Sequence, residues 1–173
     1  SALAIAHWPI RTGRKGAMNT EMVYSTKAGD YAKYRWDYAP AAIATIAAIT
    51  QMTPQSIVVD IGAGTGILTK HFVGKAGRVY AIEPNYELRQ WLTKALGASP
   101  TVSVRDGTAE NTKLPDEAVD VITVAQAIHW FDPEPARQEM RRILKAGGWL
   151  ALIRNHETGQ PEKAQAIGSL MTA

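Results

Sequence analysis

Apolar, β-branched residues recur in five short runs along the chain, and glycine or proline lies close to most of them. Runs of this kind are typical of strands that are buried on both faces of a sheet. The pattern therefore predicts five strands, over residues 56–61, 77–82, 101–105, 119–124 and 149–153.

Segments with helical spacing alternate with these strands. Ile43, Ile46 and Ile49, for example, recur along one face of an alanine-rich stretch. The predicted helices cover residues 39–50, 65–73, 86–96, 134–144 and 161–171. Asn85 is suited to cap the third of these helices, and Gly97 is suited to end it.

Alternation of strands and helices predicts the fold class. It indicates an α/β domain with a Rossmann-like, doubly wound and mainly parallel sheet that helices cover on both faces. Ligands of such sheets bind at the carboxyl ends of the strands, near the switch point in strand order. The loops that follow the first four strands are therefore the places to search for chemistry.

Composition agrees with a globular domain and excludes several kinds of site. The 173 residues are 46% hydrophobic and 20% charged, and they include no cysteine, which excludes disulfides and thiolate metal sites. No run reaches the ~18 apolar residues of a membrane-spanning helix. The basic residues near the start follow the apolar stretch 2–6, whereas in a signal peptide they precede it. We expect a cytoplasmic protein with no membrane partner.

The net charge of +3 comes from the first residues of the chain. Residues 1–17 contain Arg11, Arg14 and Lys15 and no acid, so the other 156 residues hold 16 basic and 16 acidic side chains. Equal numbers of basic and acidic side chains outside residues 1–17 give no electrostatic reason to expect a nucleic-acid partner. We interpret residues 1–17 as a flexible leader, with Met18 as an alternative start, and residues 18–173 as the functional domain.

A glycine-rich loop follows the first predicted strand and opens the next helix. It reads Asp60-Ile61-Gly62-Ala63-Gly64-Thr65-Gly66. Glycines here let the backbone pass close to a ligand and leave amides free to bind it. A dinucleotide site would have its third glycine at residue 67, where Ile67 stands, and Asp60 suits an amino group better than a pyrophosphate. A tight turn without a ligand is the alternative.

Polar residues also follow the other central strands. Glu83, before Pro84, can accept both hydroxyls of a ribose, although it could equally be an ordinary charged residue at a strand end. The third strand is followed by a polar turn that includes Thr108 and Ala109. The fourth is followed by the segment 125–132, which contains Gln126, His129 and Trp130. All of these residues would lie at one edge of the sheet.

Taken in order, these motifs resemble a known family. The segments that carry the resemblance are Val58-Val59-Asp60-Ile61-Gly62-Ala63-Gly64-Thr65-Gly66, Ala81-Ile82-Glu83-Pro84, Gly107-Thr108-Ala109-Glu110 with Leu114-Pro115, Asp120-Val121-Ile122-Thr123-Val124 and Arg142-Ile143-Leu144-Lys145-Ala146-Gly147-Gly148. They are similar to the class I S-adenosylmethionine-dependent methyltransferases, and most similar to the small-molecule, ubiquinone-biosynthesis-like branch (methyltransferase type 11). The resemblance covers about residues 24–156.

The resemblance implies a role for each matching residue. Asp60 and the glycine loop would hold the methionine moiety of the cofactor, and Glu83 would hold the ribose. Thr108 stands where many relatives carry aspartate, which leaves the backbone amide of Ala109 to serve the adenine. The full set implied to bind the cofactor is Arg35, Asp60, Gly62, Ala63, Gly64, Glu83, Pro84, Thr108, Ala109, Ala125, Gln126 and Trp130. Tyr31 would help Arg35 to close the site.

His129 is the candidate catalytic residue. Methyl transfer from a sulfonium is an in-line displacement that needs alignment more than acid–base chemistry. An imidazole at the mouth of the pocket could nevertheless deprotonate an acceptor hydroxyl, or it could be a structural neighbour of Trp130. The spacing of His7, His71, His129 and His156 suggests no metal site.

The chain departs from the family pattern after the fifth strand. Class I methyltransferases continue there with a helix and an antiparallel hairpin, whereas residues 155–173 leave room for one short helix. The family order 3-2-1-4-5 then makes residues 149–153 a sheet edge, and an exposed apolar edge invites pairing. We expect a homodimer through this edge or a chain that is truncated relative to its relatives.

Three functions follow from these observations. The leading one is methyl transfer from S-adenosylmethionine to a small-molecule acceptor. The second is a cofactor-binding but inactive truncated methyltransferase, or an interaction module. The third is an NAD-type dehydrogenase, which the glycine spacing disfavours.

Overall fold

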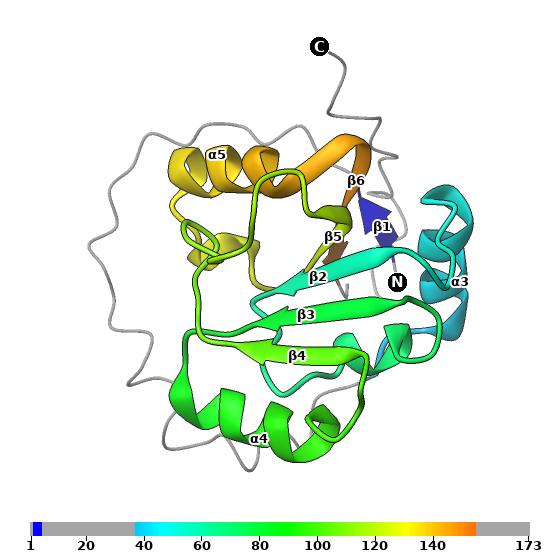
Figure 1. The fold of residues 1–173 in the computed structure, drawn as a ribbon, viewed down its shortest axis with the longest axis horizontal. Coiled ribbons are helices and arrows are strands. Elements are labelled where there is room, and N and C mark those ends of the chain that lie inside the picture. Colours follow the sequence, from blue (N-terminus) through cyan, green and yellow to red (C-terminus); the bar gives the residue numbers. More distant parts are fainter. Residues whose placement is uncertain (1, 5–36, 155–173) are drawn as a thin grey trace, which may run out of the picture.

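One sheet of six strands runs through the residues that the structure, a computed structural model, describes, namely 2–4 and 37–154 (Figure 1). Its strands are β1 (Ala2–Ala4), β2 (Ile57–Ile61), β3 (Arg78–Ile82), β4 (Val102–Arg105), β5 (Val119–Ala125) and β6 (Leu144–Arg154). The helices are α3 (Pro40–Ile49), α4 (Tyr86–Leu96) and α5 (Pro133–Ile143), with the short 3-10 helices η1 (Thr69–Phe72) and η2 (Ile128–Trp130).

The strand order confirms the predicted topology. The sheet runs β1-β6-β5-β2-β3-β4, so the five predicted strands stand in the order 3-2-1-4-5. β2 lies at the centre and pairs in parallel with both β3 and β5. Asp60 stands opposite Ala81 on one side and Thr123 on the other. The carboxyl ends of the three central strands therefore meet at one edge of the sheet.

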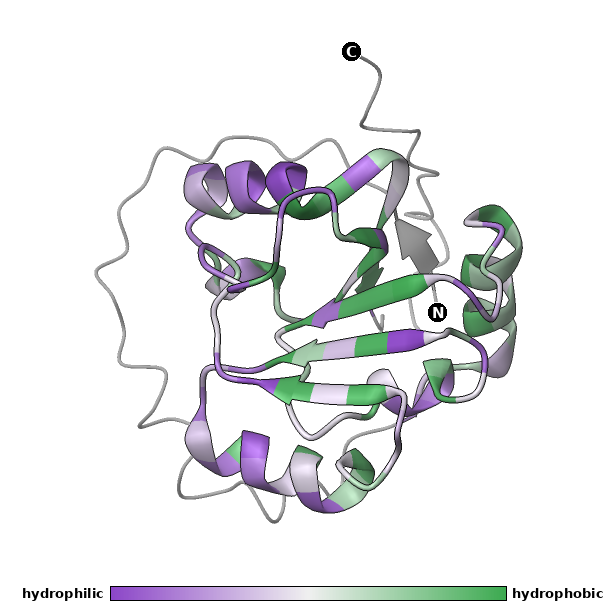
Figure 2. Cartoon of the chain, viewed as in Figure 1, coloured by the Kyte–Doolittle hydropathy of each residue, from purple (hydrophilic) through white to green (hydrophobic). Residues whose placement is uncertain are grey.

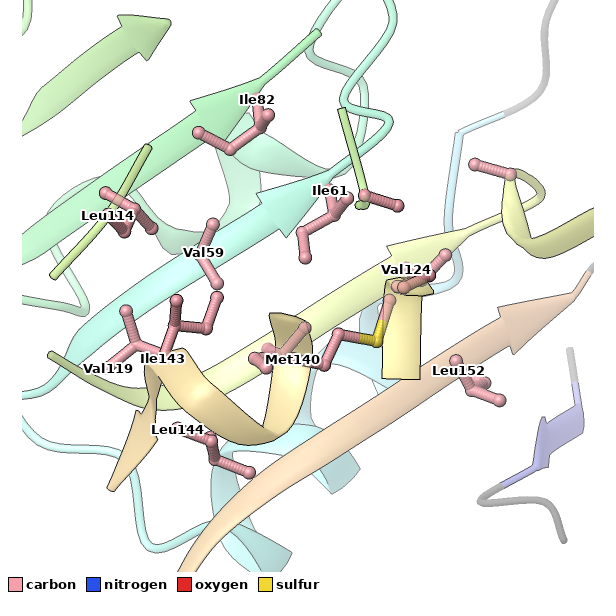
Figure 3. Close-up of a cluster of buried hydrophobic side chains, with 14 residues drawn as sticks. Val59, Ile61, Ile82, Leu114, Val119, Val124, Met140, Ile143, Leu144 and Leu152 are labelled. Carbon is pink, nitrogen blue, oxygen red and sulfur yellow. The ribbon is translucent and has the colours of Figure 1, made fainter. Parts of the chain in front are cut away.

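Alternate side chains of the central strands build two apolar layers. On one face, Val59 and Ile61 of β2 pack in a cluster with Met140 and Ile143 of α5 (Figure 3). On the other face, Val58 packs in a cluster with Ile43 and Ile46 of α3 and Phe72 of η1. The central strands are accordingly green along much of their length in the hydropathy view, whereas α5 is mostly purple (Figure 2). Burial on both faces explains why these strands read as continuous apolar runs.

Helix boundaries follow the predicted signals at most ends. The side chain of Asn85 accepts a hydrogen bond from the amide of Leu88 at 3.0 Å and caps α4, and Gly97 ends that helix. Pro133 occupies the first turn of α5. The segment 144–148, predicted as the end of a helix and a turn, instead belongs to β6, because Leu144 pairs with Val119 before a register shift leads to the pair Val121 and Trp149.

The predicted helix over residues 65–73 is wrong. Only Thr69–Phe72 forms a short 3-10 helix there. Gly66 and Gly74 have φ angles of +88° and +75°, which no right-handed helix contains. These two glycines therefore interrupt the predicted helix near its start and at its end, and the segment between them forms turns and the short 3-10 helix.

β6 does not form the outer edge of the sheet along its whole length. Ala2–Ala4 pair antiparallel with Leu152, Ile153 and Arg154, so this strand end has a neighbour that the sequence did not predict. The expectation of an exposed edge is therefore wrong for these three residues, and the first part of the predicted leader is a strand. The predicted helix 161–171, Tyr31, Arg35 and most of the leader lie outside the described residues.

Candidate active site at the carboxyl edge of the sheet

Asp60 is a carboxylate in the interior, next to the last residue of β2. The residue is 1% exposed. The hydroxyl of Thr69 donates to Oδ2 at 2.6 Å, and that of Thr123 donates to Oδ1 at 3.2 Å. Burial raises the pKa of Asp60 from its ordinary 3.8 to about 6, with a smaller contribution from the charge of Glu83. A buried acid with fixed orientation is what a pocket needs to select a cationic group.

The glycine loop needs glycine at its positions for different reasons. Gly62, Gly64 and Gly66 all have positive φ, at +72°, +58° and +88°. A Cβ on Gly62 would lie 2.6 Å from Cβ of Ala127, and one on Gly66 would lie 2.5 Å from Leu92. A Cβ on Gly64 would meet nothing within 4 Å. The loop is therefore packed at both ends and faces open space in the middle.

Backbone hydrogen bonds tie this loop to the end of β3. The amides of Gly62 and Ala63 both donate to the carbonyl of Ile82, at 2.9 and 3.0 Å. The amide of Gly64 donates to Oε2 of Glu83 at 2.8 Å. The loop thus has a fixed position before any ligand arrives, which lowers the ordering entropy of binding.

Glu83 is the second buried carboxylate of this edge, with 5% of the residue exposed. Besides the amide of Gly64, it accepts a hydrogen bond from the amide of Asn85, to Oε1 at 2.9 Å. Arg89 donates to the carbonyls of Glu83 and of the exposed Pro84. Burial raises the pKa of Glu83, and the two amides oppose that rise. Each carboxylate oxygen retains acceptor capacity, so two hydroxyl donors could still be bound.

A pocket opens beside the glycine loop. It is lined by Tyr38, Asp60, Gly62, Ala63, Gly64, Thr65, Ile67, Leu68 and Ala125. Asp60, Gly62, Ala63, Gly64 and Ala125 were predicted from the sequence, and the structure brings them together around this one space. Tyr38 was not predicted, although it lies only three residues after Arg35, and its place just before a proline-started helix is a further local signal.

The turn after β4 is less directly part of this pocket. Thr108 is exposed, and its hydroxyl accepts a hydrogen bond from the amide of Asn111 at 3.2 Å. Ala109 is 3% exposed and packs in the same apolar cluster as Val59 and Ile61. Both residues stand at the predicted edge, but neither lines the pocket.

Buried Glu139 of α5 holds the polypeptide that follows this turn. Thr112 donates to its Oε1 from both the amide and the hydroxyl, at 2.8 and 2.5 Å, and Arg142 donates to its Oε2 at 2.8 Å. Arg142 also bonds the carbonyl of Leu114 and the carboxylate of Asp116. Burial alone would raise the pKa of Glu139, but these donors lower it to about 2. The loop after β4 is therefore fixed to the helix.

The segment after β5 carries the remaining predicted residues. Gln126 has a φ of +57°, and its amide donates to the carbonyl of Ile153 at 3.0 Å. His129 and Trp130 are both exposed, with ring centroids 4.8 Å apart. Neither ring lines the pocket, so the structure places the candidate catalytic imidazole beside Trp130 and outside the pocket walls.

The described residues contain neither a metal-binding group of side chains nor a membrane-spanning helix. In residues 2–4 and 37–154, no three His, Cys, Asp or Glu side chains are grouped so that they could hold a metal ion. Over the same part of the chain, no helix has the length and apolar character needed to cross a bilayer.

Comparison with known proteins relates this edge to one enzyme class. A sequence profile described as a methyltransferase domain matches residues 59–152. An uncharacterized methyltransferase of Mycobacterium tuberculosis is 38% identical over 132 residues, which cover 76% of this chain and 51% of that protein. A ubiquinone/menaquinone biosynthesis C-methyltransferase of Hydrogenovibrio crunogenus is 32% identical over 126 residues, which cover 68% of this chain and 49% of that protein. The chain thus spans about half the length of these curated relatives.

A solved structure supports the same fold. A candidate S-adenosyl-L-methionine-dependent methyltransferase of Methanococcus maripaludis superposes with a TM-score of 0.62 at 20% sequence identity. The superposition covers 87% of this chain and 68% of that one.

Proposed function

The chain belongs to the methyltransferase domain family, and from this premise we propose that it binds S-adenosylmethionine beside the glycine loop and transfers the methyl group to a small-molecule acceptor. When bound, this cofactor supplies an activated methyl group on a sulfonium. The chain's own residues bind and orient the cofactor.

The observation that carries the proposal is the pair of buried carboxylates, Asp60 and Glu83, beside the glycine loop. Asp60 lines the pocket, and Glu83 accepts the Gly64 amide. An ionised Asp60 is suited to the cationic amino group of the methionine moiety. Glu83 has acceptor capacity for the ribose hydroxyls. The amino group and the ribose of the cofactor thus each have a matching carboxylate beside the glycine loop.

We propose that the chain contributes to catalysis by positioning the acceptor and the cofactor relative to each other. In-line displacement needs the acceptor atom aligned with the methyl group, and a fixed site supplies that alignment in advance. We assign His129 to the acceptor side, where its imidazole can take a proton from an acceptor hydroxyl. The similarity to a ubiquinone/menaquinone biosynthesis C-methyltransferase favours a small aromatic acceptor.

Calorimetric titration of the purified chain with S-adenosylhomocysteine tests the cofactor assignment. We expect saturable binding of S-adenosylhomocysteine and none of NAD. Saturable binding of NAD alone would refute the proposal in favour of a dehydrogenase. An assay of methyl transfer to a panel of small phenols and quinols then separates an enzyme from a domain that binds the cofactor without turnover.

A further inference from the structure

Tyr38 is a pocket residue that comes from outside the strand-end loops. It precedes α3, is 5% exposed and packs in the apolar cluster that includes Ile43, Val58 and Leu68. It lines the pocket together with Asp60 and the glycine loop. An aromatic residue in this position can form a wall against the cofactor.

The residue before it, Asp37, connects this segment to η1. Its Oδ2 accepts a hydrogen bond from Nζ of Lys70 at 2.8 Å, and its Oδ1 lies 2.7 Å from Nε2 of His71. The same Oδ1 accepts the amide of Tyr38 at 2.8 Å. Burial tends to raise the pKa of Asp37, but these donors lower it to about 2, so the carboxylate stays ionised at working pH. Asp37 therefore joins Tyr38 to two successive residues of η1.

The preceding residue of η1 belongs to the site already described. Thr69 donates to Asp60 at 2.6 Å, whereas Lys70 and His71 contact Asp37. Three consecutive residues thus bridge a carboxylate of the pocket and the segment that carries the pocket's aromatic wall. A shift of η1 would move both together.

The exposure of these contacts argues that they contribute little to stability. The side chains of Asp37 and Lys70 are 52% and 46% exposed, and ion pairs with such exposure typically contribute about 0–1 kcal/mol. Unlike an ordinary surface ion pair, however, these contacts connect η1 to the segment that carries Tyr38, so their loss would affect the position of a pocket residue.

We propose that Asp37 is a positioning residue that docks Tyr38 against the cofactor by anchoring it to Lys70 and His71. The inference rests on the proposed function, since Tyr38 is taken to form the wall against which the cofactor packs. Loss of the anchor leaves the fold intact but lets the wall move away from the bound cofactor.

The test combines affinity with thermal stability. Asp37→Ala is expected to weaken binding of S-adenosylhomocysteine about tenfold, or 1.4 kcal/mol, with a melting temperature within about 3 °C of the wild type. Tyr38→Leu keeps apolar bulk and is expected to weaken binding at least as much. Because Asp37 acts through Tyr38, the double variant should bind no more weakly than Tyr38→Leu alone. Glu134→Gln, which breaks an exposed ion pair on α5, is the matched control and should bind like the wild type.

The outcomes separate this inference from the proposed function. If the wild type and Asp37→Ala bind alike, the anchor has no positioning role while cofactor binding stands. Additive losses in the double variant, or a large fall in melting temperature for Asp37→Ala, would also overturn it. Should Tyr38→Leu fail to fold, the affinity and melting temperature of Asp37→Ala decide alone. A wild-type chain that binds no S-adenosylhomocysteine overturns the proposed function, and this inference with it.

Discussion

Replacing Asp60 with asparagine should make the ligand-free protein more stable and unable to bind its cofactor. The carboxylate is buried beneath the glycine loop, and two threonine hydroxyls are its hydrogen-bond donors. Asparagine has nearly the same shape and no charge, and threonine hydroxyls can donate to its oxygen or accept from its nitrogen. The substitution therefore isolates the free energy of keeping a negative charge at this position.

The magnitude follows from the pKa of Asp60. Burial raises that pKa from 3.8 to about 6, so the folded state holds the proton more tightly than the unfolded state. Asp60 then gives its full stabilisation below pH 3.8, and that stabilisation is lost as the pH rises through 6. A tenfold change in proton affinity corresponds to about 1.4 kcal/mol, so the whole effect is about 3 kcal/mol. The advantage of Asp60→Asn in free energy of unfolding should grow from about 1.5 kcal/mol at pH 5 to about 3 kcal/mol at pH 8.

Urea unfolding of both proteins between pH 5 and pH 8 measures this difference. Asp106→Asn, which changes a carboxylate that is 61% exposed, is the control and should shift the free energy of unfolding by less than about 0.5 kcal/mol. An advantage for Asp60→Asn that does not change with pH, or a variant less stable than the wild type at pH 8, would refute the reasoning. Calorimetry should show that the stabilised variant has lost binding of S-adenosylhomocysteine.

Four further substitutions test the site and its support. Glu83→Gln should weaken binding of S-adenosylhomocysteine by about 100-fold, because a charged acceptor for the ribose becomes a neutral one; an unchanged Kd would remove Glu83 from the ribose site. Gly62→Ala should lower the free energy of unfolding in urea by about 2–3 kcal/mol, because the new Cβ would be crowded and the backbone at residue 62 has a positive φ. Gly64→Ala adds no crowding and has only the cost of the positive φ, so it should lower the free energy of unfolding by about 1 kcal/mol. Equal losses for the two variants would contradict the difference in packing between residues 62 and 64. Glu139→Ala should lower the free energy of unfolding by about 2 kcal/mol at pH 7, because it leaves the buried amide and hydroxyl of Thr112 without their acceptor. That loss should shrink as the pH falls from about 4.5 towards 2, and a pH-independent loss would argue against an ionised Glu139.

The topology and the polar residues at strand ends could be predicted because local patterns encode them. Continuous apolar runs identified β2 and β3, and parallel pairing then brought the residues at their carboxyl ends to one edge. Asp60, Gly64 and Glu83 follow from this placement. The structure adds the hydrogen bond from Gly64 to Glu83, which no spacing rule specifies.

What the sequence could not predict depends on contacts between distant segments. The apolar pattern after Gly66 resembles a helix, but two glycines in the left-handed region divide it into turns. Tyr38 reaches the pocket because η1 and α3 pack on the same face of the sheet, and Asp37 contacts residues that are far along the chain. The strand Ala2–Ala4 has almost no pattern of its own, and it exists through its pairing with β6.

The packing of Gly66 against α4 has a consequence for how this domain can change in evolution. The methyl of Leu92 occupies the space that a side chain at residue 66 would need, and Leu96 stands close behind it. The volume of two helix residues that touch no proposed ligand group therefore sets how near the loop can lie to α4. We expect substitutions in the loop and in α4 to accumulate together. A smaller residue at position 92 would leave the loop less tightly packed, and a protein that kept its cofactor would have to fill that volume with another side chain nearby. The inner face of α4 therefore helps to determine the binding site that descendants of this protein inherit.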